Sequence, residues 1–558
     1  MENNILIGGA AGLGIDTLGI LIGKILCRKG YFIHSTKDFM SRIRGGHNFT
    51  QIRFGVEPVC SHWPLLDCII ALDKETVEFH AERLGEGGVI ICDESVEAKD
   101  DRIIHLPMAR FAKEVGNNRA AGSVAAGALF KIIGESFDIV EEVFMEKFEK
   151  ETAHSNFEAF KKGYEFVEEV FKINKPKKRE QIFINSNDAI ALGALAGGIG
   201  FFASYPMAPS TSIMTKLSMK QDDAKIIVEQ VEDEISAINM VLGASYAGVR
   251  SMTSTSGGGY ALMVEAMSYQ GITETPIVVV DVQRPGPATG FPTRTEQADL
   301  DFVLFSGHGE YPKMIIAVKN AEDAFYQTTR AFNLADKYQV QVIILSDQYL
   351  ADATQTIPPY DFSRVTIERH LMTKEELGNE EYKRYKPVEN GISPRIMPGK
   401  IENALVRVES HEHNEYGHIT ESAEVRTSMQ DKRMRKMEGL INEIQEPDYF
   451  GVESPEILLI GWGSMYGPIK EAVNMLNEDG ASVGALIFGD LYPLPTRLLK
   501  KYGECAKKLV NVEMNSTGQL ARLIRQETGI FLDHSILNYN GRQMDSYTVY
   551  SRVKEEVL

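Results

Sequence analysis

The strongest constraint on the fold is the repeated alternation of short apolar runs with helical stretches. The clearest run lies at 225–283, where "KIIVEQV", "RSMTSTS" and "PIVVVDVQ" enclose two helical segments. A chain that alternates strands and helices in this way builds a mostly parallel sheet covered by helices. Similar strand, glycine turn and helix units lie near the start of the chain and at 457–476. We therefore predict an α/β protein.

Breaks in this pattern divide the chain into segments. We predict α/β domains at 1–173, 182–355 and 451–558. Residues 174–181, "NKPKKREQ", are charged and aperiodic, which is typical of a linker. Residues 356–450 are polar, charged and dotted with proline, so we expect a long linker or excursion there rather than a core.

The composition narrows the class of function. The formal net charge of -19 argues against a nucleic-acid partner. No run of eighteen apolar residues predicts a membrane span, and the start "MENNILIGGA" does not look like a signal peptide. The five cysteines are scattered without a CxxC pair, which favours a reducing cytoplasm and makes a cysteine-ligated iron–sulfur cluster or zinc site within this chain improbable.

The first glycine-rich loop, "GGAAGLGID", lies between a predicted strand and a predicted helix. Its glycines match neither the strict dinucleotide fingerprint nor a P-loop; they are Gly8, Gly9, Gly12 and Gly14. A dehydrogenase with the looser GxxxGxG spacing also needs a Tyr-xxx-Lys pair some 150 residues further on, and the tyrosine there, Tyr164, has Glu168 at that spacing. The remaining interpretation of this loop is that it leads into a helix N-terminus able to bind an anionic group.

Three further stretches carry candidate binding residues. In "SRIRGGHNF", a glycine turn carries Arg42, Arg44 and His47, either as a clamp for a phosphate or carboxylate or as a solvated basic turn. The proline-rich loop "SYPMAPSTS" at 204–212 is a rigid polar loop, either a binding loop or a structural turn. The loop "VQRPGPATGFPTR" carries Arg284 and Arg294, which either bind a carboxylate or face solvent.

One acidic cluster and one histidine cluster are further candidates for a site. "VEQVEDEISA" places Glu232, Asp233 and Glu234 at a helix start, where acids cap the helix; only one has room to point into a site and exchange a proton with a ring nitrogen. "HEHNEYGH" at 411–418 lacks the H-E-x-x-H spacing of a helical metal site. We expect no metal ligands in this chain.

Together these motifs resemble the α subunit of the 2-oxoacid:ferredoxin oxidoreductases, in the form with a γ domain fused ahead of it. "GGAAGLGIDTLG" and "SRIRGGHNFTQIRFG" resemble the γ domain. "YPMAPSTSIM", "VEQVEDEISAINMVLGASYAGVR" and "QRPGPATGFPTRTEQADL" resemble the domain that holds the pyrimidine half of thiamine diphosphate. "ILLIGWGSMYGPIKEAV" resembles a transketolase C-terminal-like α/β domain. The resemblance covers essentially the whole chain and implies these three domain types.

The resemblance also implies a reaction and residue roles. A 2-oxoacid, with 2-oxoglutarate favoured, is decarboxylated at thiamine diphosphate, ferredoxin is reduced, and the acyl group passes to coenzyme A. Glu234 matches the glutamate that bonds the pyrimidine ring nitrogen, and Arg284 matches the arginine that grips the substrate carboxylate. The substrate loop is matched by Tyr205, Pro206, Pro209, Ser210 and Thr211, the cofactor turn by Gly257 and Gly258, and the region near coenzyme A by Gly8, Gly9, Gly12, Arg42, Arg44 and His47.

Two departures limit what the resemblance implies. Family members usually carry a hydroxyl residue where this chain has Ala208, so branched-chain or aryl 2-oxoacids stay open as substrates, as does a non-catalytic scaffold role. The GDG…N motif that holds magnesium and the diphosphate is absent, and only "GDLYPLP" at 489–495 comes near it. The resemblance therefore implies a β subunit that brings magnesium, the diphosphate site and an iron–sulfur cluster, with ferredoxin as acceptor, an (αβ)2 assembly and no activity of this chain alone.

Overall fold

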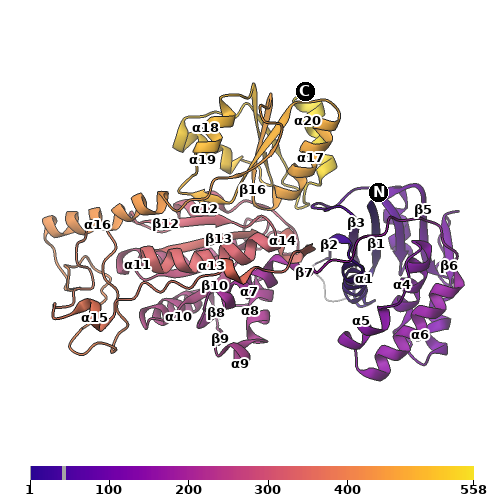
Figure 1. The fold of residues 1–558 in the computed structure, drawn as a ribbon, viewed down its shortest axis with the longest axis horizontal. Helices are drawn as coiled ribbons and strands as arrows, with labels where there is room; N and C mark the ends of the chain where they lie inside the picture. Colours follow the sequence, from indigo (N-terminus) through magenta and orange to yellow (C-terminus); the bar gives the residue numbers. More distant parts are fainter. Residues whose placement is uncertain (1, 41–45) are drawn as a thin grey trace. The chain divides into compact units, whose positions relative to one another are not determined.

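The computed structural model describes residues 2–40 and 46–558, which form two compact units (Figure 1). The first unit comprises Met1–Ile184 with Asp352–Pro359 and Asp545–Thr548. The second comprises Asn185–Ala351, Tyr360–Met544 and Val549–Leu558. Both alternate strands with helices, so the predicted α/β class is confirmed.

The first unit is built on an eight-stranded sheet, drawn mainly in indigo and purple in Figure 1. Its strands run in the order β6 (Ile103–Leu106), β5 (Leu84–Asp93), β4 (Leu66–Ala71), β1 (Glu2–Ala10), β3 (His47–Gly55), β2 (Phe32–Asp38), β14 (Thr354–Ile357) and β7 (Ile182–Asn185). β1 is parallel to β4 and antiparallel to β3, and their registers place Gly8 and Gly9 beside the start of β3.

Helices pack against this sheet, and two of them lie very close to each other. They are α1 (Ile15–Lys29), α2 (Lys74–His80), α3 (Met108–Glu114), α4 (Ala121–Ile132), α5 (Val140–Lys147) and α6 (Lys150–Phe166). α4 and α6 approach so closely that a Cβ atom at Gly127 would lie 1.9 Å from the carbonyl oxygen of Phe160. Glycine is required there because any side chain would push the helices apart.

The second unit contains a seven-stranded sheet whose carboxyl edge carries the predicted site. Its order is β18 (Asp490–Tyr492), β12 (Lys313–Ala317), β13 (Gln341–Asp347), β11 (Ile277–Gln283), β10 (Ser251–Thr255), β8 (Phe201–Ser204) and β9 (Ile227–Gln230), all parallel except β18. Its helices include α7 (Ser186–Ala196), α8 (Thr211–Ser218), α9 (Gln221–Ala224), α10 (Glu234–Tyr246), α11 (Gly257–Thr273), α12 (Leu300–Phe305), α13 (Ala321–Tyr338) and α14 (Gln348–Asp352). Loops at the carboxyl ends of parallel strands are where α/β folds bind ligands.

A five-stranded sheet completes the second unit. It has the order β15 (Asp448–Gly451), β17 (Val483–Phe488), β16 (Ile457–Trp462), β19 (Lys508–Glu513) and β20 (His534–Leu537), with α17 (Tyr466–Glu478), α18 (Arg497–Gly503), α19 (Gln519–Thr528) and α20 (Ser546–Glu556). Gln297 ties it to the larger sheet, since its side-chain amide donates to the carbonyl oxygen of Trp462 at 2.9 Å. Asp490 in "GDLYPLP" is used structurally: it pairs with both terminal nitrogens of Arg330 at 2.7 Å.

The segment 356–450 differs from the expected linker in one respect, because part of it is packed. It contains α15 (Lys374–Leu377) and α16 (Ala423–Ile441), and the side chains of Tyr385 and Lys432 are fully buried. Its polar composition suggested solvent exposure, but several of its charged side chains are buried as ion pairs with the large sheet domain. The predicted domain boundaries themselves stay predictions.

Candidate functional site

Glu234 is the first residue of α10, at the end of the loop that follows β9. Asp233 is the N-cap and its carboxylate accepts from the backbone nitrogen of Ser236 at 2.7 Å, so capping is performed by the neighbour. Glu232 is exposed, whereas Glu234 is only 3% exposed. Of the three predicted acids, the structure therefore turns only Glu234 into the interior.

The Glu234 carboxylate has an unused oxygen. Its Oε1 is buried and has no hydrogen-bond partner among the described residues. Burial, with the charge of Asp233 in addition, raises the pKa of Glu234. A buried acid left without a partner is costly unless something else satisfies it, so this oxygen is poised to share a proton with a ligand.

The first turn of α11 lies against this carboxylate. A Cβ atom built at Gly259 would lie 2.3 Å from Glu234 Oε1, and one built at Gly257 would lie 2.5 Å from Asp299 Oδ2. The turn is thus flanked by two carboxylates and tolerates no side chain at either position. Gly258, between them, is exposed, and a Cβ atom built there would meet the Ala288 carbonyl oxygen only at 4.0 Å. Of the two predicted cofactor glycines, Gly257 makes room for Asp299 and Gly258 is free to approach a ligand.

The loop 204–212 and Arg284 are brought together. Arg284 Nη1 donates to the carbonyl oxygen of Ala208 at 2.7 Å. Ser210 is fully buried and its hydroxyl donates to the carbonyl oxygen of Met207 at 2.8 Å, inside its own loop. Tyr205, Pro206 and Thr211 are partly exposed on the same loop. The hydroxyl of Ser210 is therefore engaged in shaping the loop, whereas Thr211 is partly exposed.

Three acids near Arg284 were missed at the sequence level. Asp281 on β11 is fully buried and neither of its carboxylate oxygens has a partner among the described residues. Asp299 follows the Arg284 loop, and its backbone nitrogen donates to Gln283 Oε1 at 3.0 Å. Burial raises the pKa of Glu296 to about 7 and that of Asp299 to about 6. Asp281 carries a visible signal, because it is the one acid in the apolar strand "PIVVVDVQ".

The predicted residues of the glycine loop lie in the first unit. A Cβ atom at Gly8 would collide with Thr76 at 2.5 Å, whereas Gly12 has a left-handed φ of 100° and open space around it. α1 begins after Gly14 without a side-chain cap, so its first N–H groups are available to an anion. Gly9 lies in the same loop, packed against Leu72. Arg42 and Arg44 lie outside the described residues.

His47 is held in one orientation beside this loop. Its Nε2 lies 2.8 Å from Nε2 of His80, and Arg83 donates to Nδ1 of His80 at 3.2 Å. Because a guanidinium only donates hydrogen bonds, Nδ1 of His80 is the acceptor and the ring proton is on Nε2. The Nε2–H of His80 therefore donates a hydrogen bond to Nε2 of His47. Burial lowers the pKa of both histidines, that of His80 to about 3, which keeps the pair neutral.

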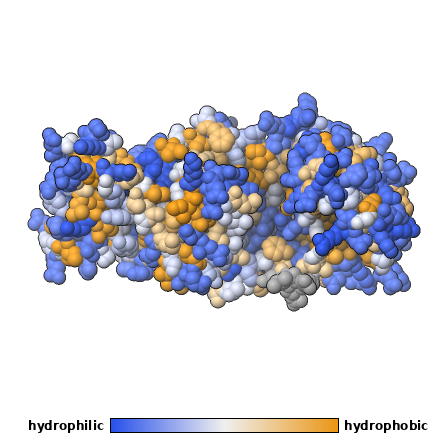
Figure 2. Space-filling model, turned by 90° about the horizontal axis from the view of Figure 1, so that it is seen from below, coloured by the Kyte–Doolittle hydropathy of each residue, from blue (hydrophilic) through white to orange (hydrophobic). Residues whose placement is uncertain are grey.

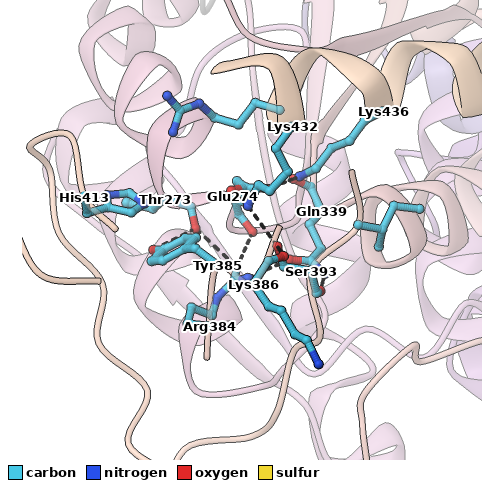
Figure 3. Close-up of polar contacts among 12 residues, drawn as sticks. Thr273, Glu274, Gln339, Arg384, Tyr385, Lys386, Ser393, His413, Lys432 and Lys436 are labelled. Atoms are coloured by element: carbon cyan, nitrogen blue, oxygen red, sulfur yellow. Dashed lines mark hydrogen bonds and ion pairs between the residues drawn. The ribbon is translucent and has the colours of Figure 1, made fainter. Parts of the chain in front are cut away.

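A different kind of buried acid lies at the far end of α11. Glu274 is 1% exposed and contacts Lys432 Nζ at 2.6 Å and Lys436 Nζ at 2.5 Å, both from α16 (Figure 3). Arg384 donates to the Glu274 carbonyl oxygen at 2.7 Å. Burial opposes ionisation of Glu274, but Lys432, Lys436 and Arg384 outweigh it and hold its pKa below the usual range. We call Glu274 with these three cations the Glu274 cluster.

The outer faces of α10 and α11 carry exposed apolar side chains. Ile235, Met240 and Leu262 are 45%, 39% and 50% exposed. Figure 2 shows apolar and weakly polar side chains gathered over the middle of the view from below, where Figure 1 has α8 to α10. Groups of this kind on a folded surface are typical of interaction sites.

A metal-binding cluster and a membrane-spanning helix are both absent from the described residues. Within residues 2–40 and 46–558, His, Cys, Asp and Glu side chains form no group of three or more suited to a metal ion. Across the same residues, every helix is too short or too polar to span a bilayer.

Comparison with known proteins places the whole chain. Family models match residues 4–166 (pyruvate ferredoxin/flavodoxin oxidoreductase), 192–432 (pyruvate flavodoxin/ferredoxin oxidoreductase, thiamine diphosphate-binding) and 455–547 (pyruvate:ferredoxin oxidoreductase core domain II). The 2-oxoacid:ferredoxin oxidoreductase subunit alpha of a Sulfolobus species is 32% identical over 97% of this chain and 95% of its own.

Two further relatives carry names that mention a substrate. The 2-oxoglutarate synthase subunit KorA of Methanothermobacter thermautotrophicus is 34% identical over 60% of this chain and 88% of its own. The solved 2-oxoglutarate:ferredoxin oxidoreductase of Magnetococcus marinus, with 2-oxoglutarate, coenzyme A and succinyl-CoA bound, is 33% identical, covers 100% of both chains and superposes with a TM-score of 0.93. The predicted fold, a γ-type domain, a thiamine diphosphate-type pyrimidine domain and a transketolase C-terminal-like domain, is confirmed. The chain belongs to the 2-oxoacid:ferredoxin oxidoreductase family.

Proposed function

We propose that this chain is the γα-fused α subunit of a thiamine diphosphate-dependent, coenzyme A-acylating 2-oxoacid:ferredoxin oxidoreductase of the cytoplasm. It oxidatively decarboxylates a 2-oxoacid, 2-oxoglutarate in the first place, to acyl-coenzyme A and carbon dioxide while ferredoxin is reduced, and the reaction is reversible. The alternative is the same reaction on a branched-chain or aryl 2-oxoacid.

The observation that carries the proposal is the orphaned Oε1 of Glu234. This oxygen is suited to a ring nitrogen of the cofactor. It is buried, the pKa of its carboxyl group is raised, and it faces a helix turn that has no side chain at Gly259. When bound, thiamine diphosphate supplies addition to the 2-oxo carbon and acceptance of the electron pair left by carbon dioxide. Glu234 holds or releases the proton at Oε1 and so sets the protonation of the pyrimidine ring.

Arg284 is proposed to bind the substrate carboxylate. Its guanidinium is already fixed against the loop 205–211 by the bond to the Ala208 carbonyl oxygen, so it needs little reorganisation to receive an anion. Tyr205, Pro206, Ser210 and Thr211 form the rigid wall of this pocket. Gly258 is proposed to let the cofactor approach the backbone of α11, and Gly257, beside Asp299, is the second predicted cofactor glycine. These roles rest on position and chemistry together.

The first unit is proposed to serve coenzyme A. The bare start of α1, the open position at Gly12 and the oriented His47 are suited to an anionic ligand, with Gly8, Gly9, Arg42 and Arg44 as the further predicted members of this site. Coenzyme A is anionic, and the Magnetococcus marinus relative was solved with it.

A β subunit is proposed to complete the site. The relatives are named as α subunits, and the exposed apolar face of α10 and α11 adjoins Glu234. The partner would bring magnesium, the diphosphate site and the iron–sulfur cluster, pass electrons to ferredoxin, and form an (αβ)2 assembly. The chain alone is then inactive.

The test is reconstitution with the β subunit and a panel of 2-oxoacids, coenzyme A and a viologen acceptor. We expect turnover with 2-oxoglutarate and a fall of at least about 100-fold in kcat for Glu234→Gln, because a positioned acid–base group contributes that much. Glu229→Gln, on β9 and outside the site, is the matched control and retains activity. Equal rates for wild type and Glu234→Gln would identify a scaffold subunit instead.

A further inference from the structure

The five-stranded sheet binds a side chain of its own polypeptide at the edge where such a sheet binds a ligand. Its strand β16 has β17, the next strand in sequence, on one side and β19 on the other, and all three are parallel. Parallel α/β sheets bind ligands at the carboxyl ends of the two strands where the order reverses in this way, here β16 and β19. In this chain Gln297, which is 1% exposed, is hydrogen-bonded to the ends of both strands.

Gln297 uses all four of its polar atoms at this edge. Its side-chain amide donates to the carbonyl oxygen of Trp462 at 2.9 Å, and its side-chain oxygen accepts from the backbone nitrogen of Met514 at 3.3 Å. Its backbone nitrogen donates to the carbonyl oxygen of Met514 at 2.7 Å, and its carbonyl oxygen accepts from Asn515 Nδ2 at 3.0 Å. Gly463 makes room for the amide, because a Cβ atom there would lie 3.0 Å from Gln297 Nε2.

The neighbours of this glutamine are held by the same domain. The backbone nitrogen of Thr295 donates to the carbonyl oxygen of Gly541 at 3.2 Å. Gln519, the first residue of α19, donates from its side chain to the carbonyl oxygen of Ala298 at 2.8 Å. The transketolase C-terminal-like domain therefore holds the segment 295–298 at several points along its length.

This segment is the returning half of the loop that begins at Arg284. The base of the loop is closed by Gln283, whose Oε1 accepts from the backbone nitrogen of Asp299 at 3.0 Å. The tip is exposed, and the carbonyl oxygen of Ala288 there lies 4.0 Å from a Cβ atom built at Gly258. The loop thus runs from the predicted substrate arginine, past the cofactor turn of α11, to the smaller sheet.

We propose that Gln297 is a positioning residue for the 2-oxoacid, through which the transketolase C-terminal-like domain fixes the loop that carries Arg284. This inference rests on the proposed function, because it takes the substrate carboxylate to bind Arg284. A binding group that is fixed before the ligand arrives loses less conformational freedom on binding, so the ligand binds more tightly. The smaller domain then contributes to substrate affinity without touching the substrate.

The first test is hydrogen–deuterium exchange on the complex of this chain with its β subunit, measured on peptides from 284–299. Gln297→Met nearly keeps the side-chain volume and removes both side-chain hydrogen bonds. The amides of Phe291 and Arg294, which donate within the loop, and of Thr295 should then exchange at least about tenfold faster than in wild type, because local opening breaks fewer bonds. Unchanged exchange in these peptides overturns the proposal, and the measurement needs no turnover.

The second test is steady-state kinetics of the complete enzyme. In Gln297→Met the KM for 2-oxoglutarate should rise about tenfold, while kcat and the KM for coenzyme A stay within about twofold of wild type. The bond from Arg284 to a carboxylate that does not react is present in ground and transition state alike, so its loss appears in KM. A fall in kcat at constant KM, the result of a merely structural role, overturns the proposal.

Asp448→Asn is the matched control, because Asp448 on β15 also joins the two sheets, through Lys319 Nζ at 2.7 Å, but makes no contact with the loop. It should leave loop exchange and KM at wild-type values; if it changes both as much as Gln297→Met does, general loosening of the domain is the cause and the proposal fails. Should Gln297→Met not fold, Gln519→Leu removes the neighbouring bond and should change exchange and KM in the same direction. If wild type turns over no 2-oxoacid, the proposed function fails; if it does and the loop does not respond, only this inference fails.

Discussion

The two ends of α11 hold buried acids in opposite electrostatic settings. At its C-terminal end, Glu274 is surrounded by Lys432, Lys436 and Arg384, and its pKa is lowered. At its N-terminal end, Glu234 and Asp299 flank the first turn with unpartnered oxygens, and their pKa values are raised. Glu234 and Glu274 are buried to a similar degree, 3% and 1% exposed, and Asp299 is half-buried. The difference lies in whether the fold provides cations.

This difference separates a structural role from a functional one. The cations of the Glu274 cluster come from 384–436, so the ion pairs fasten that segment to the large sheet domain. Asp336 repeats the arrangement with Arg250 at 2.8 Å and Arg395 at 2.5 Å. An acid that has all its partners within the chain has nothing left to offer a ligand. The acids at the start of α11 are left incomplete, which is what a shared binding site requires.

The largest expected effect is on stability, from Glu274→Gln. Removing the carboxylate leaves the buried ammonium groups of Lys432 and Lys436 without their ion-pair partner, and breaking a buried ion pair from one side costs about 3–5 kcal/mol. Urea unfolding followed by the fluorescence of Trp462, in a Trp63→Phe background, reports on the second unit. A loss below about 1 kcal/mol would show that the cluster does not hold the segment in place.

The matched control for that experiment replaces the whole group. The variant Glu274→Met with Lys432→Met and Lys436→Met removes the acid together with both lysines, and apolar side chains of similar volume often match a buried ion pair in stability. We expect it to unfold at higher urea than Glu274→Gln. If the order is reversed, uncompensated charge is not the cause of the loss.

The next effect is an opposite dependence of stability on pH at the two ends of α11. Asp299 has a folded pKa of about 6, above its ordinary value of 3.8, so the folded state binds the extra proton between these values. The contribution of Asp299 to the free energy of unfolding is complete below about pH 3.8 and is lost as the pH rises through 6. A pKa difference of about two units corresponds to about 3 kcal/mol. Glu274 has a lowered pKa, so its contribution is complete above its ordinary 4.5 and is lost only in acid.

The measurement compares wild type with Asp299→Asn between pH 4 and pH 7, again by urea unfolding with Trp462 as reporter. The free energy of unfolding of wild type relative to the variant should fall by up to about 3 kcal/mol over this range. The same comparison with Glu274→Gln should stay level from pH 5 to pH 7. A wild-type advantage that grows with pH at Asp299 would mean that the carboxylate is paired after all.

The sequence predicted the acid at the N-terminal end of α11 but not the one at its C-terminal end. Short sequence motifs contain Glu234, Arg284 and the loop 204–212, and the resemblance rests on these motifs. The three lie near one another because each follows the carboxyl end of a strand in the same parallel sheet. Glu274 was not foreseen because its partner Lys432 lies 158 positions away, in a segment whose polar composition is that of a linker. Pairing of buried charges across such distances leaves no local pattern. Of the acids not predicted, only Asp281 has a local signal, because it is the one acid in a strand of valines.

The smallest expected effect comes from the same acid-to-amide change at Asp281. Its carboxyl is already protonated, so Asp281→Asn exchanges one neutral group for another of nearly the same shape. Stability at pH 7 should change by less than about 1 kcal/mol, in contrast to Glu274→Gln, although both side chains are almost fully buried. A loss as large as that of Glu274→Gln would mean that Asp281 carries a full charge in the folded protein, and the contrast between the two ends of α11 would then not lie in the supply of cations.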